Sequence, residues 1–401
     1  MWRSGSPRRL PRPWAGVGLA VLLALVAAVV WAGARQRHGA PAAAADGPPH
    51  TAVEVSPGHC GRGWDRPRSG VQVFDLRNTS DEAAEVYLED PRSRAVYGEV
   101  EGLGPGTARP LTVRLGRGAY AFKCVPEDAD AVTGPTVRVG DGTSGPAAAP
   151  LTVHDLIPPA IAYQKWVGRG LDDAVRLAGR LRDAVDRGDL AGARTAWLPA
   201  HLRYERLGAA YGAFGDADRR INGTDAGLPG GVRDPSFTGF HRLEYGLWHG
   251  ESARTLRGPA ASLTEALTAL RGTWSQTRMD PAQLGLRAHE ILENTVQFEL
   301  TGRTDYGSGT GLATARANLD GTREVLSRLH PLLTSRYPEL PSLERKLTRT
   351  QSTLDGFRHA GGWTPPDRLS RARRERVDAL FGDLVERLAS VATLSDPRRT
   401  A

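Results

Sequence analysis

The sequence is poor in sulfur, with only two cysteines and two methionines among 401 residues. Two methionines, Met1 and Met279, exclude a methionine-rich copper(I) site, because such a site needs several thioether ligands. Aromatic residues make up only 6% of the chain, so its cores must be built mostly from leucine, alanine and valine. The length exceeds what one compact core usually organises, which predicts two or more domains.

Acidic residues are missing from the first 45 positions, which hold six arginines. The whole chain has a net charge of +7, so the remainder carries +1 (7 − 6). A protein that binds nucleic acid keeps a basic stripe on its folded part. We therefore expect no nucleic-acid partner.

An apolar run from Trp14 to Ala34 follows four of these arginines. A basic segment before about 20 apolar residues is typical of an export signal, and it is also long enough to span a membrane. Residues 1–50 are therefore interpreted as a signal or membrane-anchor segment with its linker. The protein is expected to be exported, either periplasmic or in the cell envelope, and attached to the membrane if the N-terminal helix is not cleaved.

Residues 51–140 alternate apolar and polar side chains in short runs such as "VQVFDLRN" and "AYAFKC", separated by Asn, Gly and Pro. This period of two with turn residues between the runs predicts a small β-sandwich. We expect its inner faces to carry Val71, Val73, Leu76, Leu111, Val113 and Leu115.

Both cysteines, Cys60 and Cys124, lie within this β region. Outside the cytoplasm, a lone pair of cysteines in one small domain usually forms a disulfide, here between two strands. The alternative is a pair of soft metal ligands at one end of a cupredoxin-type barrel. The residues alone leave both interpretations open.

After a linker at residues 141–150, the pattern becomes helical and no strand is expected. Long amphipathic segments with short connections predict an all-α helical bundle over residues 151–395, or two bundles packed end to end. The expected helices after the first two cover about 236–250, 260–278, 281–301, 310–334, 339–360 and 367–393.

A His-x-x-Glu pair, His241 and Glu244, lies in the apolar segment "DPSFTGFHRLEYGLWHG". Residues three apart share one face of a helix, so both side chains can converge on one ion. The alternative is an ordinary hydrogen-bonded pair. The apolar surroundings favour a metal site, because a buried ionised glutamate needs a partner.

Other candidate ligands come from three segments. Glu205 lies in "RYERLG", and Asp305 lies in the Gly-rich turn "TGRTDYGSGTG". The segment "RAHEILEN" supplies Glu290, together with His289 and Glu293 on one helical face. Its Leu286, Ile291 and Leu292, with the following Val296, are expected to be internal. Exposed acidic residues on this helix remain the alternative.

Catalytic motifs are missing. The sequence has neither the His-Glu-x-x-His of zinc hydrolases nor the Gly-x-Ser-x-Gly of serine hydrolases. These absences favour a binding protein over an enzyme.

Four segments together resemble the imelysin-like family over residues 150–395. They are "ARTAWLPAHLRYERL", "LPGGVRDPSFTGFHRLEYGLW", "RAHEILEN" and "DYGSGTGLATARANLDGT". The preceding β region looks like the cupredoxin-like domain found in the iron-uptake members of this family.

The resemblance implies a helical bundle of two repeats, with His241 and Glu244 as the metal motif and Glu205 on a neighbouring helix. It implies an extracytoplasmic component that captures iron, as Fe2+, and delivers it to a membrane permease, with a haem peroxidase as a further partner. Zinc and copper remain alternative metals. In the β domain, the resemblance implies a second metal site at Cys60, Cys124 and Glu85.

The chain departs from the family pattern at two positions. Gly208 stands where a second glutamate is usual, and Asn222 stands where an acidic residue is usual. Losing two carboxylates lowers the charge that a hard cation needs. Two alternatives to iron capture are therefore kept: a zinc metallopeptidase of the imelysin type, and a metal-free scaffold that docks to transport partners.

Overall fold

The chain divides into two units, Met1–Pro49 and His50–Ala401. The computed structural model describes residues 48, 50–360 and 362–399. The apolar run from Trp14 to Ala34 lies outside the described residues. Among the residues that are described, none of the helices is long and apolar enough to cross a membrane.

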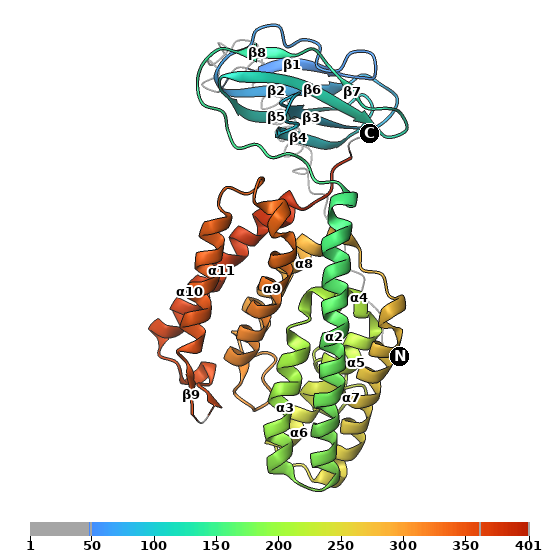
Figure 1. Cartoon of the computed structure of the whole chain (residues 1–401), viewed down its shortest axis with the longest axis vertical. Helices are drawn as coiled ribbons and strands as arrows, with labels where there is room; N and C mark the ends of the chain where they lie inside the picture. Colours follow the sequence, from blue (N-terminus) through green and yellow to red (C-terminus); the bar gives the residue numbers. More distant parts are fainter. Residues whose placement is uncertain (1–47, 49, 361, 400–401) are drawn as a thin grey trace, which may run out of the picture. The chain divides into compact units, whose positions relative to one another are not determined.

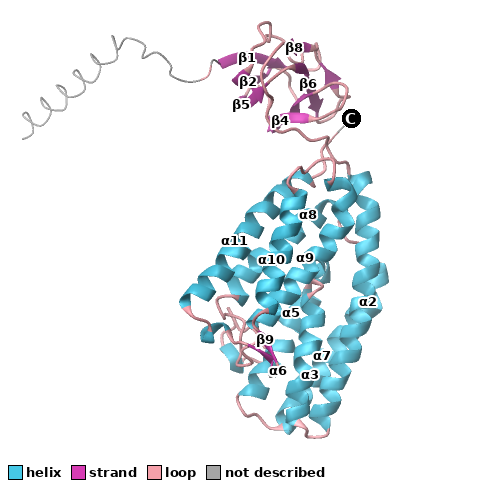
Figure 2. Cartoon of the chain, turned by 60° about the vertical axis from the view of Figure 1, so that its left-hand side comes forward, coloured by secondary structure: helices cyan, strands magenta, loops and turns pink. Residues whose placement is uncertain are grey.

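The first part of the second unit contains eight short strands in two sheets (Figure 2). One sheet has the order β1-β2-β5, and the other has the order β4-β3-β6-β7 with β8 also paired to β6. Buried side chains from both sheets, including Phe74, Leu88 and Phe122, form one core. The predicted β-sandwich is confirmed. Its strands are His50–Val55 (β1), Gly70–Asn78 (β2), Ala84–Glu89 (β3), Val96–Leu103 (β4), Ala108–Leu115 (β5), Gly118–Pro126 (β6), Val132–Thr133 (β7) and Val137–Val139 (β8).

Two of the residues expected on the inner face, Val71 and Val73, do not lie on the core face of β2. Val71 is 37% exposed, whereas Phe74 and Leu76 on the same strand are fully buried. Successive side chains of a strand point to opposite faces, and the core face of β2 has the parity of Phe74 and Leu76. Val73 has the parity of Val71 and, although it is buried, does not belong to this core, whereas Leu111, Val113 and Leu115 do.

The two cysteines form a disulfide, Cys60–Cys124. Cys60 lies in the loop after β1 and Cys124 lies on β6, so the bond joins a loop to a strand rather than two strands. Of the two alternatives left open by the sequence, the structure contains the disulfide.

The second part is helical, and the predicted helical bundle is confirmed (Figure 2). Helix α2 begins with a capping box, in which Thr152 and Asp155 satisfy each other's backbone N–H groups. The helices are Val153–Asp186 (α2), Leu190–Glu205 (α3), Tyr211–Phe214 (α4), Asp216–Asn222 (α5), Gly239–Trp248 (α6), Ala253–Thr273 (α7), Leu284–Asn294 (α8), Gly311–Leu333 (α9), Leu340–Asp355 (α10) and Arg371–Leu394 (α11).

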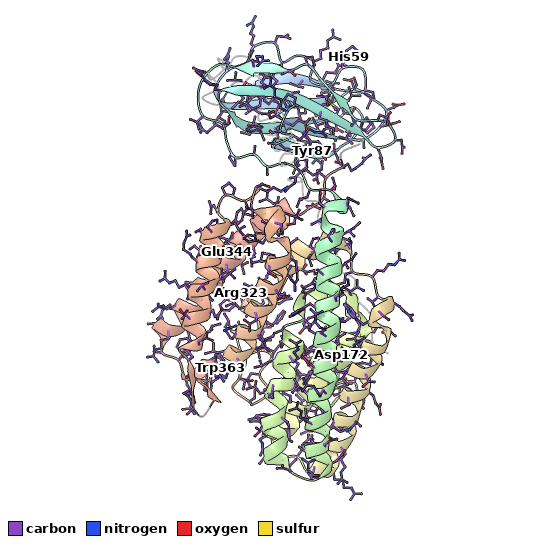
Figure 3. The ribbon with its side chains drawn as sticks, viewed as in Figure 1. His59, Tyr87, Asp172, Arg323, Glu344 and Trp363 are labelled. Carbon is purple, nitrogen blue, oxygen red and sulfur yellow. A yellow bond between two sulfur atoms is a disulfide. The ribbon has the colours of Figure 1, made fainter. Side chains whose placement is uncertain are left out.

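Two groups of four helices can be traced from the helix pairs that pack together (Figure 1). In the first group, α2 packs on α3 and α7, and α6 packs on both of these. In the second group, α8 and α10 each pack on α9 and α11. Helix α9 joins the groups by packing on α2 and α3. On the outer side of the first group, Asp172 of α2 pairs with Arg271 of α7 at 2.6 Å (Figure 3).

Two expectations for the helical part are wrong. A short hairpin follows α10, with strands Arg358–His359 (β9) and Gly362–Trp363 (β10), although no strand was expected after the linker. Leu286 is 42% exposed, because the buried face of α8 carries Leu284, Ala288, Ile291 and Leu292 instead.

Candidate metal centre

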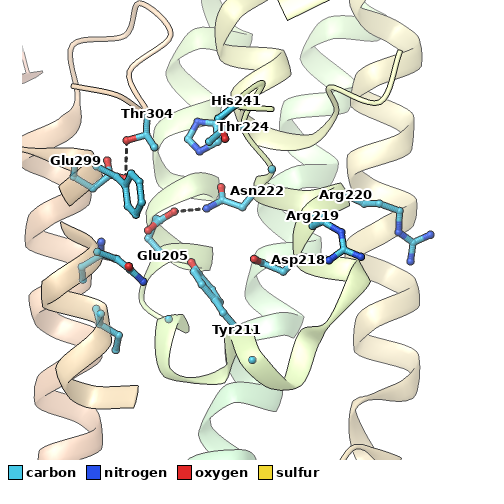
Figure 4. A pocket seen from close by; sticks show the side chains of 18 of the residues that line it. Glu205, Tyr211, Asp218, Arg219, Arg220, Asn222, Thr224, His241, Glu299 and Thr304 are labelled. Carbon is cyan, nitrogen blue, oxygen red and sulfur yellow. Dashed lines mark hydrogen bonds between the residues drawn. The ribbon is translucent and has the colours of Figure 1, made fainter. Parts of the chain in front are cut away.

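Helix α6, which carries His241 and Glu244, can start where it does because its first residue is glycine. Gly239 has a φ of +81°, a conformation that glycine adopts readily. A Cβ atom there would lie only 2.2 Å from the carbonyl oxygen of Ile221. Glycine therefore allows α6 to begin against the end of α5, and His241 and Asn222 line the same cavity (Figure 4).

Helices α3 and α6 are tied together by a buried tryptophan. Trp197 on α3 donates its indole N–H to the backbone carbonyl of Phe240 on α6, at 2.9 Å. Its ring also lies against His201, with 4.7 Å between ring centroids. Since Trp197 is only 1% exposed, this bond fixes the spacing of the two helices that carry the candidate ligands.

His241 and Glu244 face each other, with 3.5 Å between Nδ1 and Oε2. The other oxygen of Glu244 accepts hydrogen bonds from the backbone N–H groups of Tyr306 and Ser308, both at 3.1 Å, and from the Ser308 hydroxyl at 2.5 Å. Burial opposes ionisation of Glu244, but His241 and Ser308 outweigh it and lower the pKa of this carboxyl. Glu244 is therefore held as a carboxylate although it is buried.

Glu205, at the end of α3, has three polar neighbours. Its Oε1 lies 3.1 Å from Nε2 of His201 and accepts a 2.7 Å hydrogen bond from the amide of Asn222. With its amide oriented to satisfy both of its neighbours, Asn318 donates to Oε2 at 3.0 Å. Burial opposes ionisation, but His201 and Asn222 outweigh it and lower the pKa of Glu205. A second buried carboxylate is thus kept ionised.

Glu205 and His241 line a cavity of about 1050 Å³ (Figure 4). Its wall is formed by residues from both helix groups, including the segment between α3 and α6, helix α8 and helix α9. The acidic residues of the wall are Glu205, Asp216, Asp218, Glu290 and Glu299, and the basic residues are Arg219, Arg220 and Arg287.

Two of these acids have raised pKa values. Burial and the negative charge of Glu205 raise the pKa of Glu299 to about 8, although His241 and Thr304 act in the opposite direction. Burial raises the pKa of Asp218 to about 6, against the effect of its 2.6 Å hydrogen bond from Tyr204. Glu299 is therefore largely protonated at neutral pH and adds little negative charge to the cavity.

The other candidate ligands already have ion-pair or hydrogen-bond partners. Glu290 lines the cavity but is paired with Arg287 at 2.5 Å. Asp305 accepts hydrogen bonds from the backbone N–H groups of Gly307 and Gly309, which folds the turn that holds Glu244. His289 and Glu293 lie 3.8 Å apart on α8.

The two departures from the family pattern have direct structural counterparts. A Cβ atom at Gly208 would lie 3.0 Å from Cγ1 of Ile291, so an isoleucine lies where a longer side chain would begin. Asn222 hydrogen-bonds to Glu205, which a carboxylate at this position could not do without a shared proton. Neither Gly208 nor Asn222 places a negative charge beside Glu205, whose other polar neighbours are His201 and Asn318.

In the β part, the disulfide binds the sulfur atoms of Cys60 and Cys124 to each other. Glu85 accepts a hydrogen bond from the hydroxyl of Tyr87 and lies 3.9 Å from Arg399. A metal site at these three residues would need the disulfide to be reduced, because the thiolate is the metal ligand.

Across residues 48, 50–360 and 362–399, no three His, Cys, Asp or Glu side chains are arranged to hold a metal ion. The site consists instead of two His/Glu pairs, His201–Glu205 on α3 and His241–Glu244 on α6. The two histidine rings lie 5.3 Å apart, between centroids.

Two groups of the site were not expected from the sequence: His201, which is buried, and Glu299, which is half-buried. The spacing of His201 and Glu205 was visible in "AHLRYE", because residues four apart share a helical face. No comparable signal marks Glu299. It ends a single π-helical segment, Thr295–Glu299, which follows α8 directly.

Comparison with known proteins gives a consistent result. The family model described as Imelysin matches residues 161–391. The chain is similar to the iron uptake system component EfeO of Escherichia coli (strain K12), with 26% identity over 347 residues, covering 86% of this chain and 90% of that protein. The proteins of the same name in Shigella flexneri and Shigella sonnei (strain Ss046) match with the same identity and coverage.

Proposed function

Since the chain belongs to the imelysin family, we propose that it is an extracytoplasmic metal-binding component of an iron uptake system. In this role it captures Fe2+ and passes it to a membrane permease, with a haem peroxidase as a further partner. Support comes from relatives that are named iron uptake system components and that align over 86% of the chain. The arginine-flanked apolar run at its N-terminus is consistent with export.

The observation that carries the proposal is the pairing of His241 with Glu244 beside a large, partly acidic cavity. The carboxyl groups of Glu244 and Glu205 both have lowered pKa values. Ionised carboxylates and neutral imidazole are the forms that bind divalent metals. We therefore assign His241, Glu244 and Glu205 as the ligands, with Glu290 and Asp305 further out.

Captured iron is cargo in this proposal, so the site must release it as well as bind it. Oxygen and imidazole donors suit Fe2+, and they also admit zinc and copper. With Asn222 and Gly208 in place of acids, fewer negative charges hold the ion, and its release is easier. The wide cavity gives the ion a path that avoids crossing the packed core.

The peptidase alternative is less well supported by the site. A general base in a zinc peptidase must accept a proton from water. Glu244 has one oxygen occupied by three donors and the other facing His241. The scaffold alternative rests on Gly208 and Asn222 and predicts that the chain binds no metal.

The proposed role can be tested in cells whose native gene is deleted and replaced by a plasmid copy. The measurement is the uptake of radioactive Fe2+ by these cells. A copy with His241→Ala and Glu244→Ala should fail to restore uptake. The matched control changes His289 and Glu293 to alanine, which removes another His/Glu pair from a helix. Equal uptake by both double variants would exclude the α6 pair, and full uptake without metal binding would favour the scaffold.

A further inference from the structure

The cavity that His241 lines is much larger than a metal ion needs. Its volume is about 1050 Å³, whereas an ion with six bound waters takes up roughly 180 Å³, at about 30 Å³ per water. Pockets that bind small organic molecules usually measure about 300–1,000 Å³. The volume therefore suits an organic molecule that carries the ion.

An exposed aromatic ring forms part of the cavity wall. Phe298, in the π-helical segment that follows α8, lines the cavity and is 39% exposed, so its ring is not used in the core. Tyr211 of α4 also lines the cavity. Aromatic side chains are common in pockets for small molecules, because they pack against the apolar part of the ligand. A bare ion makes no use of a phenyl ring.

The wall also carries groups that recognise carboxylates. Three arginines, three asparagines and four serine or threonine hydroxyls line the cavity. Two of the arginines pair with carboxylates of the wall, Arg219 with Asp216 and Arg287 with Glu290. The exposed Arg220, next to Arg219 on α5, has no ion pair or side-chain hydrogen bond among the described residues (Figure 4). A guanidinium group repels a bare cation and binds a carboxylate through two parallel hydrogen bonds.

The protein offers few ligand atoms to an ion in this cavity. Glu205 and His241 line it. Within the part of the chain that the structure describes, no three His, Cys, Asp or Glu side chains surround one position for an ion. An ion that arrives in a chelate keeps the oxygen atoms of the chelator as ligands. Such an ion needs only one or two further donors from the protein.

We propose that the cavity binds iron as its complex with a small organic acid that carries several carboxylates. His241 contacts the ion, while Arg220 and Phe298 contact the organic acid. The inference rests on the proposed function and names the form in which the iron is captured.

The two departures from the family pattern fit this form of the cargo. Gly208 and Asn222 both line the cavity and carry no charge. Carboxylates at these two positions would repel the carboxylates of a chelate. The chelator instead supplies the negative charge that holds the ion.

Anaerobic equilibrium dialysis of the full chain with radioactive Fe2+ and radioactive citrate tests the inference, because citrate is a small acid with several carboxylates. The wild-type chain should retain iron and citrate in a one-to-one ratio, and citrate should increase the affinity for iron by about tenfold. If the chain captures the bare ion, citrate competes with the protein, so less iron is retained and no citrate is retained with it.

Two variants test the contacts to the organic acid. Phe298→Ala and Arg220→Gln should each lower the affinity for the iron–citrate complex by about tenfold, and they should lower the affinity for Fe2+ alone by less. The matched controls are Leu286→Ala, which removes another exposed apolar side chain, and Arg254→Gln, which removes an exposed arginine of α7. Both controls lie outside the cavity wall and should behave as the wild type.

The possible outcomes separate this inference from the proposed function. Retention of iron without citrate, or equal retention of citrate with and without iron, overturns the inference and leaves the proposed function standing. Equal effects of the cavity variants and their controls also overturn it. If the wild-type chain retains iron in neither form, both the inference and the proposed function are wrong.

Discussion

Asn222 donates a 2.7 Å hydrogen bond to Glu205, from an amide at a position where the resemblance to the imelysin-like family implies an acid. The bond helps to keep Glu205 ionised inside the protein. It adds no negative charge with which to attract a cation. If the site binds metal as proposed, this hydrogen bond stabilises the metal-free form and lowers the affinity for metal.

Asn222→Asp should lower the stability of the metal-free protein and raise its affinity for Fe2+. A carboxylate beside Glu205 replaces a donor by a like charge, so the metal-free protein should lose about 2 kcal/mol of stability. The additional carboxylate should increase the affinity for Fe2+ about tenfold. Thermal melting with and without metal, together with calorimetric titration, measures both effects.

The matched control is Asn294→Asp, which makes the same substitution at an exposed residue of the cavity wall. It should change neither stability nor affinity by a comparable amount. Tighter binding in both variants would indicate a general effect of cavity charge rather than a ligand at position 222.

Local patterns in the sequence were enough to predict the β-sandwich, the helical bundle and the His241–Glu244 pair. Each depends on a period of two or on residues three or four apart, which the chain displays directly. Val71, Val73 and Leu286 were misplaced because an apolar side chain does not by itself reveal which face of its strand or helix packs in the core.

The remainder of the site depends on contacts between distant segments. The donors to Glu244, Tyr306 and Ser308, lie 62 and 64 residues away along the chain. Glu299 reaches the cavity from a π-helical segment, and such segments have no clear signal in a single sequence. Only the folded chain brings these groups together.

The raised pKa of Glu299 should make stability depend on pH. In the folded chain this carboxyl has a pKa of about 8, against 4.5 for an ordinary glutamate. Between these two values the unfolded chain releases the proton and the folded chain retains it. Stability therefore falls as pH rises from about 4.5 to 8, by up to about 1.4 kcal/mol per pH unit.

Glu299→Gln removes this contribution, so the metal-free variant should become more stable than the wild type as the pH increases. Urea unfolding at pH 5, 6.5 and 8 measures the difference. Glu290→Gln, which removes a carboxyl paired with Arg287, is the control and should not reproduce this trend. A constant difference between wild type and Glu299→Gln at all three pH values would contradict the assignment.

Comparing two tryptophans separates the effect of the Trp197–Phe240 hydrogen bond on metal binding from its effect on the free energy of unfolding. Trp197 donates to Phe240, and Trp274 donates to Gln164; both bonds are 2.9 Å long and join different helices or segments. Trp197→Phe and Trp274→Phe should each cost about 1–3 kcal/mol, because a carbonyl loses its donor. Only Trp197→Phe should also weaken Fe2+ binding. If both variants change Fe2+ affinity equally, the hydrogen bond between α3 and α6 does not position the ligands.

The disulfide and the metal site should be independent. Replacing Cys60 and Cys124 by serine opens a loop of 64 residues, which costs about 4 kcal/mol by the chain-entropy relation. Unfolding of the β part should then occur at lower denaturant concentration, while Fe2+ affinity is unchanged. Loss of Fe2+ binding in this variant would move the metal site to the cysteines.

The proposed function requires that His241 and Glu244 hold iron. Anaerobic calorimetric titration of Fe2+ into the wild-type chain and into the His241→Ala/Glu244→Ala variant tests it most directly. We expect one binding site per chain in the wild type and no measurable binding in the variant, with both proteins folded. Binding of equal strength and stoichiometry in the two proteins would contradict it.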